Sequence, residues 1–453
     1  MREMRVLSPT AILGYGFPLS SFKSGMELDP HLIVVDAGST DPGPYYLGAG
    51  VSFTHRNAVK RDLTLLLEGA ISQRIPLIIG TAGGCGGAPH LQWNLEIIRE
   101  IATEKGLNFN MALIPAEIDK NLVRDAFRQG QISPLKGVPE LTEDDISQAT
   151  RIVGQMGIEP IMVAIEGGAQ VILAGRAYDP AVFAAFPIMG GYDRGLAFHM
   201  GKILECASIA AIPGSGSDCA IGYLRDDHFI IEPLNPNRRC TVTSVSAHTL
   251  YEKSNPYILP GPGGHLDLRE TRFTQIGKGS VKVEGSRFRP SEEYTIKLEG
   301  AKKVGYRTIS VSGVRDPIMI PQLDSILNEV QDRVRDNFSE LGEGSYLNFR
   351  LYGKNGVMGP LEPEKDITPY EVGIIIDVVA GTQDMANTIC SFARSTLLHF
   401  GYAGRLATAG NLAFPFSPSD INMGEVYNFC IYHLMKVKDG KTLFPVEFLE
   451  IGG

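Results

Sequence analysis

Three carboxylate residues lie at or just after the ends of apolar segments of the chain. Carboxylate side chains can donate and accept protons. Asp36 ends the apolar run at residues 31–36, Asp41 lies in the turn-rich loop that follows, and Glu166 is followed by two glycines. A carboxylate held against a substrate can act as a general acid or a general base. Asp36, Asp41 and Glu166 are therefore candidate catalytic residues. The structural alternative is that the aspartates hold turns and cap helices and that Glu166 is a solvated loop acid.

A cation and a carboxylate, Arg176 and Asp179, follow the apolar run at residues 171–175. A guanidinium group at the end of a buried strand is well placed to bind a carboxylate or a phosphate through two parallel hydrogen bonds. Arg176 and Asp179 are therefore candidate substrate-binding residues. The alternative is a local salt bridge that organises the loop.

The stretch from residue 75 to residue 100 combines an apolar run, a glycine loop and the start of a helix. Pro89 suits the first turn of that helix, because proline lacks the N–H group that would have no partner there. Backbone N–H groups and the helix dipole converge on an anion in this geometry. The sequence therefore predicts an anion-binding loop, whose glycines are Gly83, Gly84, Gly86 and Gly87.

Cys85 lies in the middle of this loop and is a candidate nucleophile. The pKa of a thiol is lowered at a helix N-terminus, which favours the reactive thiolate. His90, five residues later, could serve as its base. The alternative is that Cys85 is a small side chain tolerated in a glycine loop. We favour this alternative, because the closeness of Cys85 and His90 in sequence does not establish a contact between them.

The glycine loop does not match the standard nucleotide-binding signatures. It contains no G-x-x-x-x-G-K-[ST] motif, and in a G-x-G-x-x-G motif that starts at Gly84 the third glycine would be Pro89. We therefore predict no nicotinamide, flavin or other cofactor. His265 and Asp267 follow two glycines and could bind a metal, but the chain has no H-x-H or H-E-x-x-H spacing. We predict no metal site, and His265 is kept as a candidate substrate-binding residue.

The elements that would position these residues alternate between strand and helix over about the first 215 residues. Apolar runs of strand length at residues 31–36, 75–80, 108–115 and 171–175 are separated by helical patterns. This alternation predicts a parallel sheet with helices on both faces. Ligands bind beyond the carboxyl ends of such strands, so we expect Asp36, Cys85, Glu166 and Arg176 to meet at one rim.

The alternation stops near residue 217. Residues 218–318 contain short β-branched segments bounded by turns, which predict a smaller mixed β region. Residues 319–453 read as a C-terminal α/β segment, with an amphipathic helix at 319–340 followed by a strand and a second helix. The predicted division is therefore 1–217, 218–318 and 319–453.

The composition excludes several classes of partner. The formal net charge is −9, which argues against nucleic acid because phosphate binding needs a basic patch. No apolar run reaches the roughly 18–20 residues that span a bilayer, and the N-terminus is too polar for a signal peptide. The six cysteines are scattered without a C-x-x-C pair, so a zinc ribbon is unsupported. A cytoplasmic protein, which could form a homo-oligomer, is the resulting expectation.

Four stretches resemble one known family. They are VVDAGSTDPGPYYLG at 34–48, GTAGGCGG at 80–87, GRAYDP at 175–180 and PGGH at 262–265. Together they resemble the AtuA family, named for acyclic terpene utilisation, and the resemblance runs from about residue 5 to about residue 430. It implies a catabolic enzyme encoded beside acyl-CoA and branched-acid degradation genes. The resemblance implies that many longer relatives carry a small extra C-terminal domain, and because this sequence ends at Gly453 we expect a separate small partner subunit in its place.

The residues and the resemblance together favour a hydratase or lyase that uses no cofactor. Its substrate would be an anionic small molecule, namely a branched or unsaturated acid or its CoA thioester, because the rim offers carboxylates for proton transfer and an anion cradle. One alternative is a hydrolase or acyl transferase with Cys85 as nucleophile. Another is a non-catalytic subunit that needs a small partner protein to complete its site.

Overall fold

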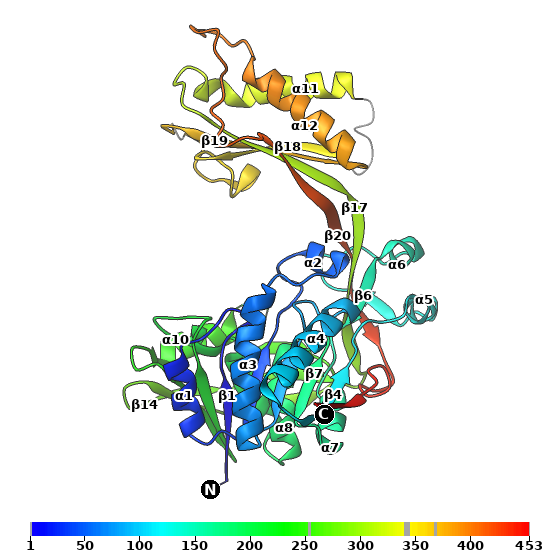
Figure 1. The fold of residues 1–453 in the computed structure, drawn as a ribbon, viewed down its shortest axis with the longest axis vertical. Coiled ribbons are helices and arrows are strands. Elements are labelled where there is room, and N and C mark those ends of the chain that lie inside the picture. Colours follow the sequence, from blue (N-terminus) through cyan, green and yellow to red (C-terminus); the bar gives the residue numbers. More distant parts are fainter. Residues whose placement is uncertain (1, 252–254, 339–344, 367–368, 453) are drawn as a thin grey trace. The chain divides into compact units, whose positions relative to one another are not determined.

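The computed structural model describes residues 2–251, 255–338, 345–366 and 369–452 (Figure 1). The chain divides into two compact units, which are Met1–Lys302 with Phe429–Gly453, and Lys303–Asn428. Within the described ranges, no helix has both the length and the apolar character needed to cross a membrane.

A ten-stranded sheet forms the centre of the first unit, and five consecutive strands within it are parallel. In spatial order these strands are β1 (Glu3–Ser8), β2 (Leu32–Asp36), β3 (Leu77–Gly80), β7 (Val171–Ala174) and β4 (Phe109–Ile114). Every residue of β2, β3 and β7 is buried. Burial on both faces explains why these strands read as continuous apolar runs.

Helices cover both faces of this sheet. Successive side chains of a strand point to opposite faces, so each buried strand contributes apolar side chains to both. Leu32 and Val34 join one apolar cluster, whereas Ile33 and Val35 join the other. The first cluster includes residues of α7 (Glu159–Glu166), α8 (Asp179–Met189) and α9 (Arg194–Leu204), and the second includes residues of α1 (Leu19–Glu27), α3 (Arg56–Gln73) and α4 (Ala88–Lys105). The α/β fold class is thus confirmed, with a large mixed sheet whose parallel strands have helices on both faces.

The β-rich stretch after residue 217 extends this sheet instead of forming a body of its own. On one side the added strands are antiparallel: β9 (Ala220–Arg225), β10 (His228–Pro233), β15 (Ser280–Glu284) and β14 (Arg272–Ile276). On the other side β21 (Glu447–Ile451) pairs with β4. The predicted division at residues 217 and 318 therefore differs from the two compact units. The strand β9 pairs with β1, which lies more than 200 residues earlier in the chain, and no local sequence pattern indicates this pairing.

Shorter elements complete the first unit. The strands β12 (Ile258–Gly261), β13 (Gly264–Asp267) and β16 (Arg287–Pro290) form a small antiparallel sheet. The remaining elements are α2 (Pro44–Ala49), α5 (Lys120–Arg128), β5 (Ile132–Pro134), α6 (Glu143–Gln148), β6 (Arg151–Gly154), β8 (Ala211–Ile212), β11 (Arg239–Cys240) and α10 (Val242–Leu250).

The second unit has the chain order β-α-β-β-α-β. Its elements are the part of β17 (Thr295–Val314) after Lys302, α11 (Leu323–Asn337), β18 (Tyr346–Tyr352), β19 (Val372–Ala380), α12 (Gln383–Leu398) and the part of β20 (Asp420–Lys436) before Phe429, and the strands lie in the order β18-β19-β17-β20. This is the split βαβ arrangement of ferredoxin-like domains. The first residues of β17 and the last residues of β20, which include Lys297, Glu299 and Tyr432, belong to the first unit. Residues of α11 and α12 share one apolar cluster with β19, and Figure 1 shows both helices along one face of this sheet.

Candidate functional site

The loops that follow β2, β3 and β7 are tied together at the carboxyl ends of these strands. Ala37 donates its backbone N–H to Gly80 O (2.9 Å), and Ala82 donates to Ala174 O (2.9 Å). These bonds continue the parallel register beyond the sheet. They bring the loops that carry Asp36, Cys85 and Arg176 to one rim, as predicted from the strand pattern.

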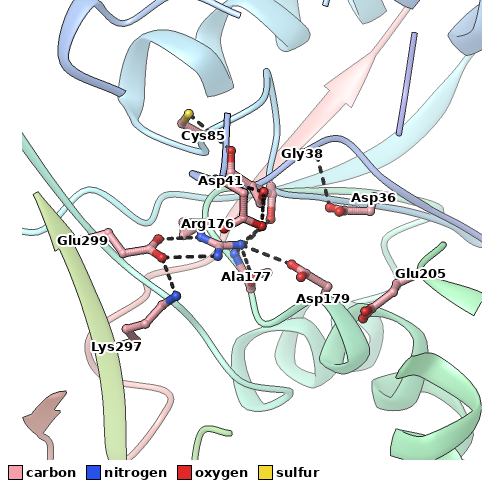
Figure 2. Close-up of polar contacts among 12 residues, drawn as sticks. Asp36, Gly38, Asp41, Cys85, Arg176, Ala177, Asp179, Glu205, Lys297 and Glu299 are labelled. Atoms are coloured by element: carbon pink, nitrogen blue, oxygen red, sulfur yellow. Dashed lines mark hydrogen bonds and ion pairs between the residues drawn. The ribbon is translucent and has the colours of Figure 1, made fainter. Parts of the chain in front are cut away.

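Arg176 forms a buried ion-pair network at this rim (Figure 2). Its Nε donates to Glu299 Oε2 (2.7 Å), and its Nη1 donates to Asp179 Oδ1 (3.2 Å) and to Ala177 O (2.9 Å). The Arg176 side chain is only 3% exposed. Its donors are therefore engaged with two carboxylates and a backbone carbonyl within the protein.

Glu299, on β17, joins Arg176 to a second cation, Lys297. The Lys297 Nζ lies 2.6 Å from Glu299 Oε1. Burial by itself would raise the pKa of the Glu299 carboxyl, but the charges of Arg176 and Lys297 lower it to about 2. Glu299 is therefore ionised and serves as the anchor of both cations.

Lys297 is the more accessible of these two cations. Its side chain is 20% exposed, and its Nζ donates to the Tyr432 hydroxyl (3.2 Å) and lies 4.7 Å from the centre of the Tyr432 ring. Burial acts to lower the pKa of Lys297, but the charge of Glu299 outweighs it and raises this pKa above its usual value. Lys297 therefore carries an ammonium group, which can bind an anion.

A cavity of about 510 Å³ opens onto this network. Its polar lining comes from Asp41, Gln155, Arg176, Asp179, Thr295 and Lys297, and its remaining lining comes from Leu135, Tyr178, Pro260, Gly261, Pro262, Tyr432 and Leu434. Small-molecule sites commonly have this volume and this combination of apolar walls with a few polar groups. The cavity therefore suits a small ligand that carries both a charged group and apolar parts.

Two of the predicted carboxylates border this cavity. Asp179 begins α8 and its side chain is 26% exposed. Asp41 is exposed and accepts a hydrogen bond from the Ser39 hydroxyl (2.9 Å). Both side chains can therefore be reached by a ligand in the cavity.

Asp36, at the end of β2, is more deeply buried than Asp41 and Asp179. It is 6% exposed and accepts a hydrogen bond from the backbone N–H of Gly38 (3.3 Å). Burial raises the pKa of its carboxyl well above the ordinary value, and the negative charge of Asp179 raises it further. Both effects favour the protonated form of the Asp36 carboxyl.

Glu166 does not belong to the site, and its assignment as a catalytic residue is corrected here. It is the last residue of α7, it is exposed, and it precedes β7 instead of following a strand. The start of β7 is the end of the sheet opposite to the rim where ligands bind. The apolar run 161–165 belongs to a helix, so the expectation that a strand ends at Glu166 is wrong.

The glycine loop packs against the protein and does not line the cavity. All four glycines are buried, and a Cβ at Gly86 (φ +69°) would collide with the backbone nitrogen of Arg176. The first N–H of α4, that of Ala88, already donates to Glu117 Oε2 (2.8 Å). The helix N-terminus does bind a carboxylate, but that of Glu117, so the structure does not support a substrate cradle at Gly83, Gly84, Gly86 and Gly87.

Cys85 and His90 are both buried, and each side chain has a backbone carbonyl as its hydrogen-bond partner. Cys85 is fully buried, its Sγ donates to Ser39 O (3.6 Å), and burial raises the pKa of its thiol to about 12. His90 Nε2 is hydrogen-bonded to Tyr46 O (3.0 Å), and burial lowers the pKa of its imidazole to about 4. This arrangement does not support a thiolate nucleophile activated by His90.

His265 lies on β13 opposite Pro260 of β12, and it is not among the residues that line the cavity. The hairpin instead contributes Pro260, Gly261 and Pro262 to the cavity wall. The neighbouring Asp267 is paired with Arg269 (2.6 Å). In the described part of the chain, no group of three or more His, Cys, Asp or Glu side chains is placed to hold a metal ion.

The residues that sequence reasoning missed are Lys297, Glu299 and Tyr432. Lys297 and Glu299 alternate along β17 with the buried Ile296 and Leu298. That alternation is a signal of two charged residues directed to one face of a strand. Nothing local indicates that this face meets the rim formed by residues 36–41 and 176–179.

Comparison with known proteins identifies the family. The model of the family described as acyclic terpene utilisation family protein AtuA matches residues 56–213 and 225–415. Neither the curated proteins nor the solved structures contain a match to this chain. Because the family model covers most of the sequence, the chain belongs to the AtuA family of acyclic terpene utilisation proteins.

Proposed function

We propose that this protein is a cofactor-independent hydratase or dehydratase. Its substrate would be a branched or unsaturated carboxylic acid, or the CoA thioester of one. The observation that carries the proposal is the cavity in which Asp179 and Lys297 stand beside apolar walls. Membership of a family of acyclic terpene utilisation proteins agrees with a branched hydrocarbon substrate.

Lys297 and Tyr432 would hold the carboxylate or the thioester carbonyl. The Lys297 ammonium is fixed by Glu299 and lies over the Tyr432 ring. When water adds to an activated C=C bond, negative charge develops on the carbonyl oxygen. A preorganised ammonium group and a hydroxyl group near that oxygen stabilise this charge.

Asp179 would transfer the proton. It takes a proton from water while the water oxygen bonds to the β-carbon, and it then gives that proton to the α-carbon. The C=C bond is replaced by one C–O bond and one C–H bond, so no oxidant or reductant is needed. Arg176 fixes the Asp179 carboxylate from the protein side, and Asp41 borders the same cavity and can orient the water.

The alternative enzyme, a hydrolase or acyl transferase that uses Cys85, loses support because the thiol is buried and protonated. We do not propose it.

The test is turnover by the purified chain of a panel of unsaturated acids and their CoA thioesters, with no cofactor added. Incorporation of ¹⁸O from labelled water, measured by mass spectrometry, identifies hydration. We expect Asp179→Asn to lose at least about 100-fold in kcat, the usual contribution of a general acid or base. Lys297→Met should raise KM as well as lower kcat, because Lys297 binds the acid group.

Two matched controls keep the assay specific. Glu166→Gln removes an exposed carboxylate at the opposite end of the sheet, and Lys436→Met removes an exposed lysine paired with Glu293. Both should retain wild-type rates. Full activity of Asp179→Asn would refute the assignment of Asp179. Turnover by the chain on its own would exclude the requirement for a small partner subunit that the family resemblance suggested.

A further inference from the structure

The strand β18 forms one edge of the sheet in the second unit. It pairs with β19 along its whole length, and among the described residues no strand pairs with its other side. An unpaired edge presents backbone N–H and C=O groups to other chains, and proteins commonly protect such edges with lysine, proline or a bulge. The sequence of β18, YLNFRLY, contains no lysine or proline, and its pairing with β19 contains no bulge. This edge is therefore suited to pairing with a further strand.

The sequence of β18 reads almost the same in both directions from Phe349. A tyrosine stands at each end and a leucine stands next to each tyrosine, so that only Asn348 and Arg350 break the symmetry. In a dimer with a two-fold axis, identical strands run antiparallel, and residues at equal distances from the axis lie opposite each other. An axis at Phe349 therefore places tyrosine opposite tyrosine and leucine opposite leucine. The strand is in this sense complementary to a second copy of itself.

On the face of the sheet that carries α11 and α12, this pairing would cover apolar side chains. Leu351 is buried in the apolar cluster of the second unit, whereas Leu347 and Phe349 pack against that cluster and remain partly exposed. In the dimer Leu347 would lie opposite the partner's Leu351, and Phe349 opposite the partner's Phe349. Removing partly exposed apolar surface from water favours association. Leu351 O already accepts from the N–H of Gly356 (2.8 Å), so the backbone bonds between the copies would lie mainly about Phe349.

On the opposite face, the two residues that break the symmetry complement each other. Arg350 would lie opposite the partner's Asn348, whose amide oxygen can accept a hydrogen bond from the guanidinium group. The Arg350 side chain is 46% exposed, and its Nη2 lies 3.7 Å from Asp377 Oδ2, which is beyond hydrogen-bond distance. Arginine at both positions would set like charges opposite each other, which destabilises a strand pair. The departure from symmetry therefore favours the pairing.

We propose that two copies of this chain associate through β18, with a two-fold axis at Phe349. The second units of the two copies then share one continuous sheet, with α11 and α12 of both copies on the same face. A register slip of one residue would set the helix face of one copy against the open face of the other. An axis at Arg350 would place two arginines opposite each other. The inference does not depend on the proposed function, because β18 contributes nothing to the cavity.

Sedimentation analysis over a range of concentrations tests the interface by a charge swap. The wild-type chain should form a dimer. Asn348→Arg sets an arginine opposite Arg350 twice in each dimer, so the dissociation constant should rise by at least about tenfold. The double variant Asn348→Arg with Arg350→Asn again sets arginine opposite asparagine and should restore the wild-type value. Thr274→Arg adds the same charge to β14, an edge strand of the ten-stranded sheet, and should change nothing.

Oxidative cross-linking tests the position of the axis. Phe349→Cys would bring the two introduced thiols close enough for a disulfide, which a non-reducing gel detects as a linked dimer. Leu347→Cys is the matched control, because the two positions 347 would lie several residues apart along the paired strands and should not link. If Phe349→Cys does not fold, the charge swap decides, since it changes only Asn348 and Arg350.

Three results would overturn the inference. They are a wild-type chain that stays monomeric at every concentration, a dimer that Asn348→Arg does not weaken, and cross-linking of Leu347→Cys as readily as of Phe349→Cys. A dimer with the expected responses in a protein that hydrates none of the substrate panel would remove the proposed function and leave this interface standing.

Discussion

Arg176 and Glu299 are 123 residues apart in the sequence and form a buried ion pair, with Arg176 Nε 2.7 Å from Glu299 Oε2. The arginine follows β7 of the parallel sheet, and the glutamate lies on β17. This pair joins the rim of the sheet to the strand that carries Lys297. The polar lining of the cavity therefore comes from both segments, and its geometry depends on the pair.

Arg176→Met should destabilise the protein by about 3–5 kcal/mol, because it leaves Glu299 buried with half of its compensating charge. Chemical denaturation of the variant and the wild type measures the difference. Arg128→Met is the matched control, since Arg128 pairs with Glu143 on the exposed surface, and it should leave the denaturation midpoint unchanged. A wild-type midpoint for Arg176→Met would show that the pair does not support the fold.

Asp36→Asn should gain stability relative to the wild type as the pH rises. Burial and the charge of Asp179 raise the pKa of Asp36 in the folded state well above 3.8. The stabilising contribution of such an acid is complete below the unfolded pKa and is lost as the pH rises toward the folded pKa. Asparagine has no proton to lose, so the difference grows by up to about 1.4 kcal/mol for each pH unit in that window.

Thermal unfolding of both proteins at pH 5 and at pH 8 checks this sign. The melting temperature of Asp36→Asn relative to the wild type should be higher at pH 8 than at pH 5. A difference that is constant between the two pH values would mean that Asp36 ionises normally in the folded protein.

Cys85 should resist alkylation in the folded protein. Its thiol is fully buried and burial raises its pKa to about 12, so almost no thiolate is present at neutral pH. Treatment with iodoacetamide at pH 7, followed by peptide mass spectrometry, should leave Cys85 unmodified, whereas denatured protein should be labelled there. Rapid labelling of Cys85 in the native protein would restore the nucleophile hypothesis.

Gly86→Ala should destabilise the protein more than Gly130→Ala does. Both glycines have positive φ angles, +69° and +67°, so both variants carry backbone strain. A Cβ at Gly86 would collide with the Arg176 backbone, whereas a Cβ at Gly130 would meet nothing within 4 Å. The free energy of unfolding should therefore fall by at least about 1 kcal/mol more for Gly86→Ala. Equal losses would indicate that the glycine loop is not closely packed.

The sequence by itself determined the parallel sheet and part of its rim. Runs such as Leu32–Asp36 and Val171–Ala174 are apolar on both faces, and this property is local, so residue types alone identify them as buried strands. The rule that ligands bind beyond the carboxyl ends of parallel strands then places Asp36 and Arg176 at one edge. The same reasoning failed for Glu166, because a short apolar run in a helix has the length of a strand.

Only the tertiary structure decided what surrounds that rim. The glycine loop has the composition of an anion-binding loop, but Gly86 packs against the backbone of Arg176. The first N–H group of α4 donates its hydrogen bond to Glu117. Glu299 and Lys297 reach Arg176 from a strand more than 100 residues later in the chain. Electrostatic interactions of this kind depend on distance and burial in space. Neither quantity is a property of residue type or of spacing along the chain, so the partners of these charges could not be read from the sequence.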